Sequence, residues 1–128
     1  ASIWEEIVSN GKPGATLAAY SLGSLYLDGL GVPRDQLRAL DYYRISALLD
    51  YQPGQCRVGA VSMMAGADTQ SNYLVENGLM WMMVAAARGY PQAIQMLPQF
   101  KQQIRIAIQN KARTKASRCI RDLPANCL

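Results

Sequence analysis

The chain has 128 residues, of which half are hydrophobic, and a formal net charge of +4 at neutral pH. This length accommodates one domain with a modest core, and the sequence has no run of eighteen apolar residues that would predict a membrane-spanning segment. Histidine is absent, which removes the commonest general base and metal ligand, so we expect no enzyme activity, no metal and no other cofactor.

Apolar spacing predicts two helices early in the chain. Before them, Trp4, Ile7 and Val8 indicate an N-terminal helix or cap. The first of the two helices has apolar residues at i, i+4, i+7 and i+8, which lie on one helix face. This stripe consists of Ala18, Leu22, Leu25 and Tyr26.

A turn separates the two predicted helices. The segment Gly29-Leu-Gly31-Val-Pro33 ends the first helix, because glycine adopts left-handed backbone angles and proline cannot continue a hydrogen-bonded turn. Asp35 is a suitable N-cap for the second helix, since its carboxylate can accept unpaired backbone N–H groups. The apolar stripe of that helix consists of Leu40, Tyr43 and Ala47.

Residues 18–47 follow the pattern Ala-x3-Leu-Gly-x2-Tyr-x2-Gly-x-Gly-Val-x2-Asp-x3-Ala-x2-Tyr-Tyr-x3-Ala. This pattern resembles the Sel1-like repeat, a helix-turn-helix unit related to the tetratricopeptide repeat. The resemblance implies an all-α fold, an α-solenoid of stacked antiparallel helix pairs with about two to three repeats. It also implies a protein–protein interaction module. One such unit cannot bury both of its stripes without neighbours.

A less regular copy of this unit follows. An offset of 36 residues places Gly23 on Gly59, whereas an offset of 39 residues places Tyr43 on Met82. The difference predicts that the second turn is longer by three residues, within residues 66–74.

A third copy has a recognisable start at Ala93 and Leu97, although Pro98 stands where the first copy has Gly23. We therefore predict a single domain with four parts. These are an N-terminal helix or cap (1–13), a first repeat (14–51), a second repeat (52–91), and a partial repeat with a basic C-terminal helix (92–128).

The positive charge is concentrated in the tail. Residues 101–128 hold seven basic side chains and one acidic side chain. The spacing predicts one amphipathic helix from Phe100 to about Cys119, with a stripe that also contains Ile104, Ile108, Ala112 and Ala116. We expect a capping helix that covers the end of the stack. Alternatively, Lys111 and Lys115 contact an acidic partner, whereas the lack of an aromatic residue in the tail argues against nucleic acid.

The three cysteines bear on the cellular compartment. Cys119 and Cys127 would lie about 12 Å apart on a continuous helix, too far for a disulfide, but Pro124 allows the chain to turn back. We expect these two to pair and Cys56 to remain a buried thiol. Pairing of Cys56 with a tail cysteine, and three reduced thiols, are the alternatives. A disulfide implies an oxidising compartment, so we expect a periplasmic or secreted protein, with the cytoplasm as the alternative.

Two surfaces are candidate partner contacts. Four consecutive large residues, Met80-Trp81-Met82-Met83, cover most of a helix circumference, so Met80 or Met83 is expected to reach the surface. In Sel1-like stacks the first helices of successive units line the concave side. By that resemblance, the concave side presents Tyr20, Ser24, Arg57 and Gln95.

The resemblance implies a non-catalytic binding module of a bacterial, exported protein whose partner is another protein. The basic tail favours an acidic partner. The alternative is an immunity protein that binds and neutralises a toxic effector enzyme. Loss of the partner's activity on mixing would favour the second hypothesis over the first.

Overall fold

The computed structural model of the chain describes residues 14–121 and residue 127. The N-terminal helix or cap predicted for residues 1–13 therefore lies outside the described residues. The described part is helical and contains no strand, which confirms the all-α fold class. In chain order the helices are α2 (Ala15–Asp28), α3 (Gln36–Leu48), α4 (Gln52–Thr69), α5 (Asn72–Ala87), α6 (Pro91–Lys101) and α7 (Ile106–Arg121).

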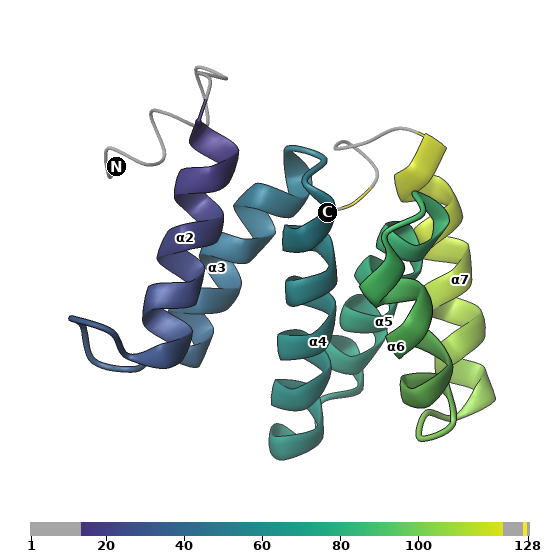
Figure 1. Cartoon of the computed structure of the whole chain (residues 1–128). Helices are drawn as coiled ribbons and strands as arrows, with labels where there is room; N and C mark the ends of the chain where they lie inside the picture. The colour runs from purple at the N-terminus through teal and green to yellow at the C-terminus, as the bar shows by residue number, and fades with distance from the viewer. Residues whose placement is uncertain (1–13, 122–126, 128) are drawn as a thin grey trace.

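The helices stack in the order of the sequence (Figure 1). α2 packs against α3 and α4 packs against α5, as two antiparallel pairs. α3 contacts α4, and α5 contacts α6, so each pair continues onto the next first helix. α7 packs against α5 and covers the end of the stack. This arrangement confirms the predicted helical solenoid with a C-terminal capping helix.

The first pair forms as its sequence predicts. Gly29 ends α2 with a left-handed backbone (φ 70°), and its N–H bonds the Leu25 carbonyl. Asp35 caps α3 by accepting the backbone N–H of Arg38 at 3.1 Å. Gly23 allows the two helices to approach closely, since a Cβ there would lie 2.8 Å from the ring of Tyr43.

α4 and α5 also approach each other closely at a glycine, and there the neighbouring atoms belong to the backbone of the facing helix. A Cβ at Gly59 would lie 2.9 Å from the carbonyl oxygen of Gly78 and 3.0 Å from the backbone nitrogen of Met82. Gly59 thus meets Met82 as Gly23 meets Tyr43, which agrees with the offsets of 36 and 39 residues in the sequence. At the α4–α5 crossing backbone thus meets backbone, whereas at Gly23 a tyrosine ring lies between α2 and α3.

The predicted long second turn is wrong. Only Gln70 and Ser71 separate α4 from α5, because the additional residues extend the helices themselves. α4 has 18 residues against 14 in α2, and α5 has 16 against 13 in α3. Gln70 ends α4 with a left-handed backbone (φ 55°), and the Ser71 hydroxyl accepts the N–H of Leu74 to begin α5.

The predicted continuous helix from Phe100 to Cys119 is also wrong, because residues 102–105 interrupt it. The Gln109 side chain supports the break by donating to the carbonyls of Lys101 (2.9 Å) and Ile104 (2.7 Å). Those carbonyls would otherwise lack partners at a helix end. Beyond the break, the apolar face of α7 is as predicted, with Ala112, Ala116 and Cys119 buried.

The chain returns to α7 near its C-terminal end. Cys119 and Cys127 form a disulfide with their Cα atoms 4.5 Å apart, and both side chains are buried. Cys56 is a free, buried thiol in α4, close to the sulfur of Met82.

Candidate functional site

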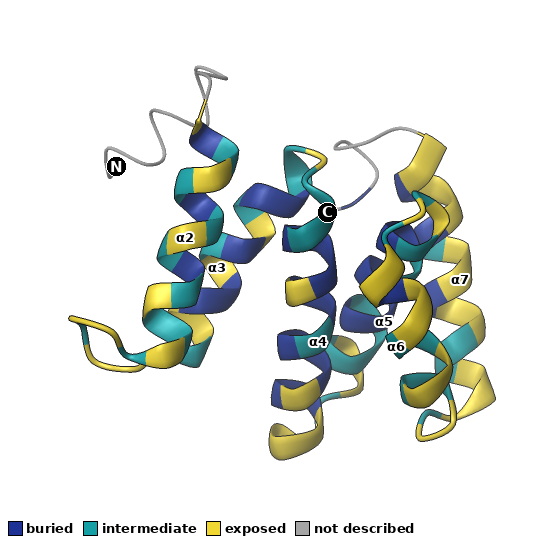
Figure 2. Cartoon of the chain, in the orientation of Figure 1, coloured by how far each residue is buried: buried dark blue, intermediate teal, exposed yellow. Residues whose placement is uncertain are grey.

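One face of α4 remains exposed after α3 and α5 have packed against the helix. Most α4 residues are buried, as Figure 2 shows by the dark blue along this helix. The exposed or half-buried positions in its middle turns follow one line, because they are three or four residues apart. We call this line the α4 stripe, and it consists of Arg57, Ala60, Met64 and Ala67.

A group of aromatic side chains surrounds the N-terminal end of the α4 stripe. The Tyr20 ring of α2 lies 5.4 Å from the ring of Tyr43 and 5.4 Å from the ring of Tyr51, measured between ring centroids. Arg57 donates from Nε to the Tyr20 hydroxyl at 3.4 Å. Tyr90 is near enough to interact electrostatically with Tyr20, Tyr51 and Arg57. We call Tyr20, Tyr43, Tyr51, Tyr90 and Arg57 the tyrosine–arginine cluster.

Arg57 brings a positive charge to this cluster without a neighbouring carboxylate. Within residues 14–121 it forms no salt bridge, and the hydrogen bond to Tyr20 raises its pKa. Burial raises the pKa of Tyr43, against the opposing effect of its hydrogen bond with Ser24 (2.9 Å). Burial also raises the pKa of Tyr90, so these two phenols stay neutral at pH 7.

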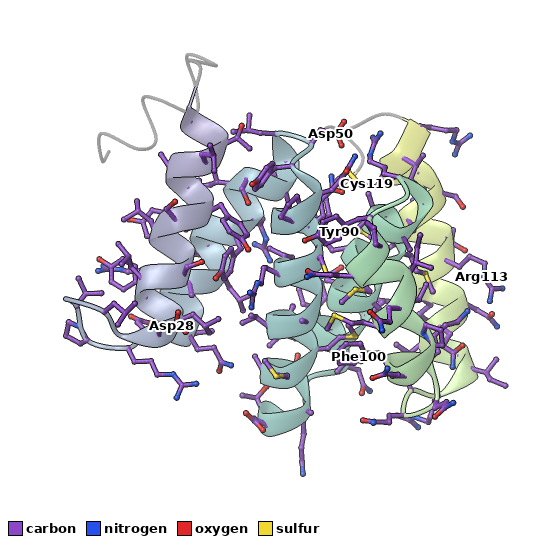
Figure 3. All side chains as sticks on the ribbon, viewed as in Figure 1. Asp28, Asp50, Tyr90, Phe100, Arg113 and Cys119 are labelled. Carbon is purple, nitrogen blue, oxygen red and sulfur yellow. A yellow bond between two sulfur atoms is a disulfide. The ribbon has the colours of Figure 1, made fainter. Side chains whose placement is uncertain are left out.

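A cleft of about 420 Å³ lies at the other end of the α4 stripe. α4, α5, the end of α6 and the start of α7 form its walls, and Figure 3 shows Phe100 beside α4. Its apolar lining is mostly buried or half-buried and consists of Met63, Met64, Ala67, Val75, Phe100, Ile104 and Ile108. The polar lining residues are exposed at the rim, and they are Gln70, Asn72, Gln103 and Arg105.

The stripe joins the cluster to the cleft, because Arg57 belongs to both the stripe and the cluster, and Met64 and Ala67 belong to both the stripe and the cleft. We call this exposed face, with the cluster at one end and the cleft at the other, the groove along α4. In the described part of the chain, no three histidine, cysteine or acidic side chains are grouped to hold a metal ion. None of the six described helices is both long and apolar enough to cross a bilayer.

The hairpin that supplies Tyr20 and Tyr43 matches a known family. Residues 16–51 match the Sel1 repeat. The chain contains a Sel1 repeat. No curated protein and no solved structure matches the chain. The Sel1 match covers α2, the first turn and α3, and ends at Tyr51 where α4 begins.

Three of the four predicted concave residues lie near one another. Tyr20 contacts Arg57, and Ser24 of the Sel1 repeat bonds the Tyr43 hydroxyl, whose ring packs on Tyr20. Gln95 is exposed on α6, and within residues 14–121 its side chain forms no hydrogen bond to the cluster. The structure therefore brings together the Sel1 repeat and the first helix of the following pair.

The predicted surface role of Met80 is wrong, because only 2% of its side chain is exposed. α5 has α4, α6 and α7 around it, so all four consecutive large residues can be covered. Met83 is half-buried and packs against the core. Four large side chains in a row thus mark a central helix of this stack, not a contact surface.

The two predicted lysines of α7 differ. Lys115 is engaged within the protein, where its Nζ lies 2.8 Å from the Glu76 carboxylate and 3.2 Å from the Asn77 side-chain oxygen. It also lies 5.4 Å from the centre of the Tyr73 ring. These contacts hold α7 on α5. Lys111 is exposed.

Sequence reasoning did not identify Tyr51, Tyr90 or the cleft. Tyr51 and Tyr90 are the N-cap residues of α4 and α6, and they are separated by the same 39 residues that relate Tyr43 to Met82. This offset could have identified both tyrosines as equivalent positions of successive units. The cleft has no comparable signal, because its walls come from four separate segments.

Cys56 is expected to resist alkylation in the native protein. Burial raises the pKa of its thiol, so the reactive thiolate is scarce at neutral pH. Iodoacetamide should label one cysteine only after denaturation, and all three after denaturation with a reductant. Mass spectrometry counts the labels, and rapid labelling of Cys56 in the native protein would contradict its burial.

Proposed function

We propose that the chain is a non-catalytic protein-interaction module whose partner contacts the tyrosine–arginine cluster. Sel1 repeats support an interaction role in general, and one observation supports this particular location. Arg57 is exposed among tyrosine rings, and no carboxylate in the described residues neutralises it. Tyrosine and arginine, together with tryptophan, are enriched among the side chains that dominate binding energy at interfaces, because they combine a large contact area with polar ends.

The test compares three forms of the full chain as bait in the native host. Wild type and Arg113→Ala should retain the same partner, and Arg57→Ala should lose it, with binding weakened about tenfold or more. Arg113 is a matched control, since it is also exposed but lies on the outer side of α7, away from α4 (Figure 3). Equal thermal stability of the three proteins would exclude misfolding, and equal retention by all three would refute the proposed contact.

We also propose that the protein is exported to the periplasm or secreted. The Cys119–Cys127 disulfide supports this, since disulfides persist mainly in oxidising compartments. Alkylation of intact host cells before lysis tests it, and labelling of Cys119 and Cys127 without reductant would refute it. If the captured partner is an enzyme whose activity falls on mixing, the module acts as an immunity protein; unchanged activity favours an adaptor.

A further inference from the structure

The proposed function leaves open what kind of segment the groove binds. We propose that the groove along α4 binds an extended segment of the partner protein that has an acidic residue four or five positions away from a large apolar residue. The acidic side chain pairs with Arg57, and the apolar side chain enters the cleft. This inference rests on the proposed function, because it uses the same groove.

The spacing follows from the geometry of α4. Arg57 and Ala67 are the two ends of the α4 stripe, separated by ten residues. Helical residues rise about 1.5 Å each, so the two positions lie about 15 Å apart along the helix axis. An extended chain advances about 3.3 Å per residue. Four or five residues of an extended partner segment therefore span the distance from Arg57 to the cleft.

The acidic requirement comes from the charges of the groove. The Nε–H of Arg57 donates a hydrogen bond to the Tyr20 hydroxyl. The terminal nitrogens of Arg57 have no carboxylate partner within the described chain. Arg105 is the one ionisable residue in the cleft lining, and it is exposed at the rim. A carboxylate on the partner can accept two parallel hydrogen bonds from a guanidinium. A second acidic residue next to the apolar one would complement Arg105 in the same way.

The apolar requirement comes from the cleft. Its volume is about 420 Å³, which is large enough for one large side chain. Its inner walls consist of uncharged, apolar side chains, among them Phe100, Ile104 and Val75. Met63 and Met64 add flexible thioethers, which adjust to side chains of different shape. The cleft therefore selects for size and hydrophobicity without specifying one residue type.

Ala60 lies between the two subsites and offers no charge, and Met64 begins the cleft. The intervening residues of the partner segment pass over small or apolar side chains there. We expect them to vary in sequence, because no charge or cavity between the two subsites selects among them. The recognised pattern thus has two fixed positions, one acidic and one apolar, joined by a variable spacer. The groove therefore distinguishes partner segments by the length of this spacer as well as by the chemistry of the two positions.

The experiment selects peptides from a random twelve-residue library displayed on phage, with the full chain as bait. Wild-type bait should enrich peptides with Asp or Glu four or five positions from Leu, Ile, Met or Phe. Arg57→Glu should replace the acidic preference with Lys or Arg at the same position, because the charge complementarity is reversed. Arg113→Glu, with the same charge change on the outer side of α7, should leave the preference unchanged.

A labelled peptide from the wild-type selection then tests the cleft by fluorescence anisotropy. Ala67→Trp fills the cleft and should weaken binding at least about tenfold, whereas Ser117→Trp on the outer face of α7 should change it less than about twofold. Thermal unfolding of both variants shows that each is folded.

The outcomes separate the two proposals. Enriched peptides without the predicted spacing, or equal binding by Ala67→Trp and Ser117→Trp, would overturn the acidic–apolar segment. If the host partner still depends on Arg57 in that case, the proposed function stands without this inference. If the host partner is indifferent to Arg57, the proposed function itself fails.

Discussion

Replacement of Gly78 by alanine is expected to destabilise the protein by about 2 kcal/mol or more, a fall in Tm of roughly 8 °C. A Cβ there would lie 2.7 Å from the Gly59 carbonyl oxygen and 2.8 Å from the Met63 backbone nitrogen. Both are backbone atoms of α4, so the helices must separate to make room. Thermal unfolding followed by circular dichroism measures the loss.

The expected loss of stability is opposite in sign to the usual effect of replacing a helical glycine by alanine. In an exposed helix, replacement of glycine by alanine stabilises by up to about 1 kcal/mol. Gly23→Ala is a useful comparison, because its new Cβ would meet the Tyr43 ring instead of backbone and should cost less. An unchanged or raised Tm for Gly78→Ala would show that α4 and α5 leave room for a Cβ at this crossing.

Reduction of the Cys119–Cys127 disulfide should lower the stability by about 2–3 kcal/mol, because the open tail regains conformational freedom in the unfolded state. Cys119 anchors the end of α7, and Cys127 packs near Arg44, Tyr73 and Trp81 of the preceding helices. The bond joins the tail to α7 and so keeps Cys127 near α3 and α5. Unfolding in urea with and without reductant measures the difference.

The double variant Cys119→Ala/Cys127→Ala is the control for this measurement. It should resemble the reduced wild type and should not respond to reductant, since Cys56 has no partner for a disulfide. Equal stability of the wild type with and without reductant would mean that the tail contributes nothing to the fold.

The first hairpin was predictable because its determinants are local. Gly29 and Asp35 act within one turn of their own position, and the close contact of Gly23 with Tyr43 follows from the repeat pattern. The two errors concern helix ends. Between α4 and α5, Gln70 adopts a left-handed backbone, which the sequence does not predict because the residue is not a glycine. Between α6 and α7, the apolar spacing continues across a break that Gln109 stabilises.

The candidate site was predictable where the repeat register decides it. Tyr20 and Arg57 were identified because the first helices of successive units line one face. Met80 was assigned wrongly, since α5 is surrounded by α4, α6 and α7, and α7 packs onto it from far along the chain. The cleft is formed where four segments of the chain come together. The spacing of residues within one helix does not predict where four segments meet.

The position of α4 in the stack has a thermodynamic consequence. Its buried faces contact α3 and α5, and thus join the Sel1 repeat to the rest of the molecule. A ligand that binds only the folded form lowers the population of every open state in which its site is lost. A segment bound along α4 should therefore slow amide hydrogen exchange in α3 and α5 as well as in α4. Occupancy of the groove would make two helix pairs unfold as one cooperative unit.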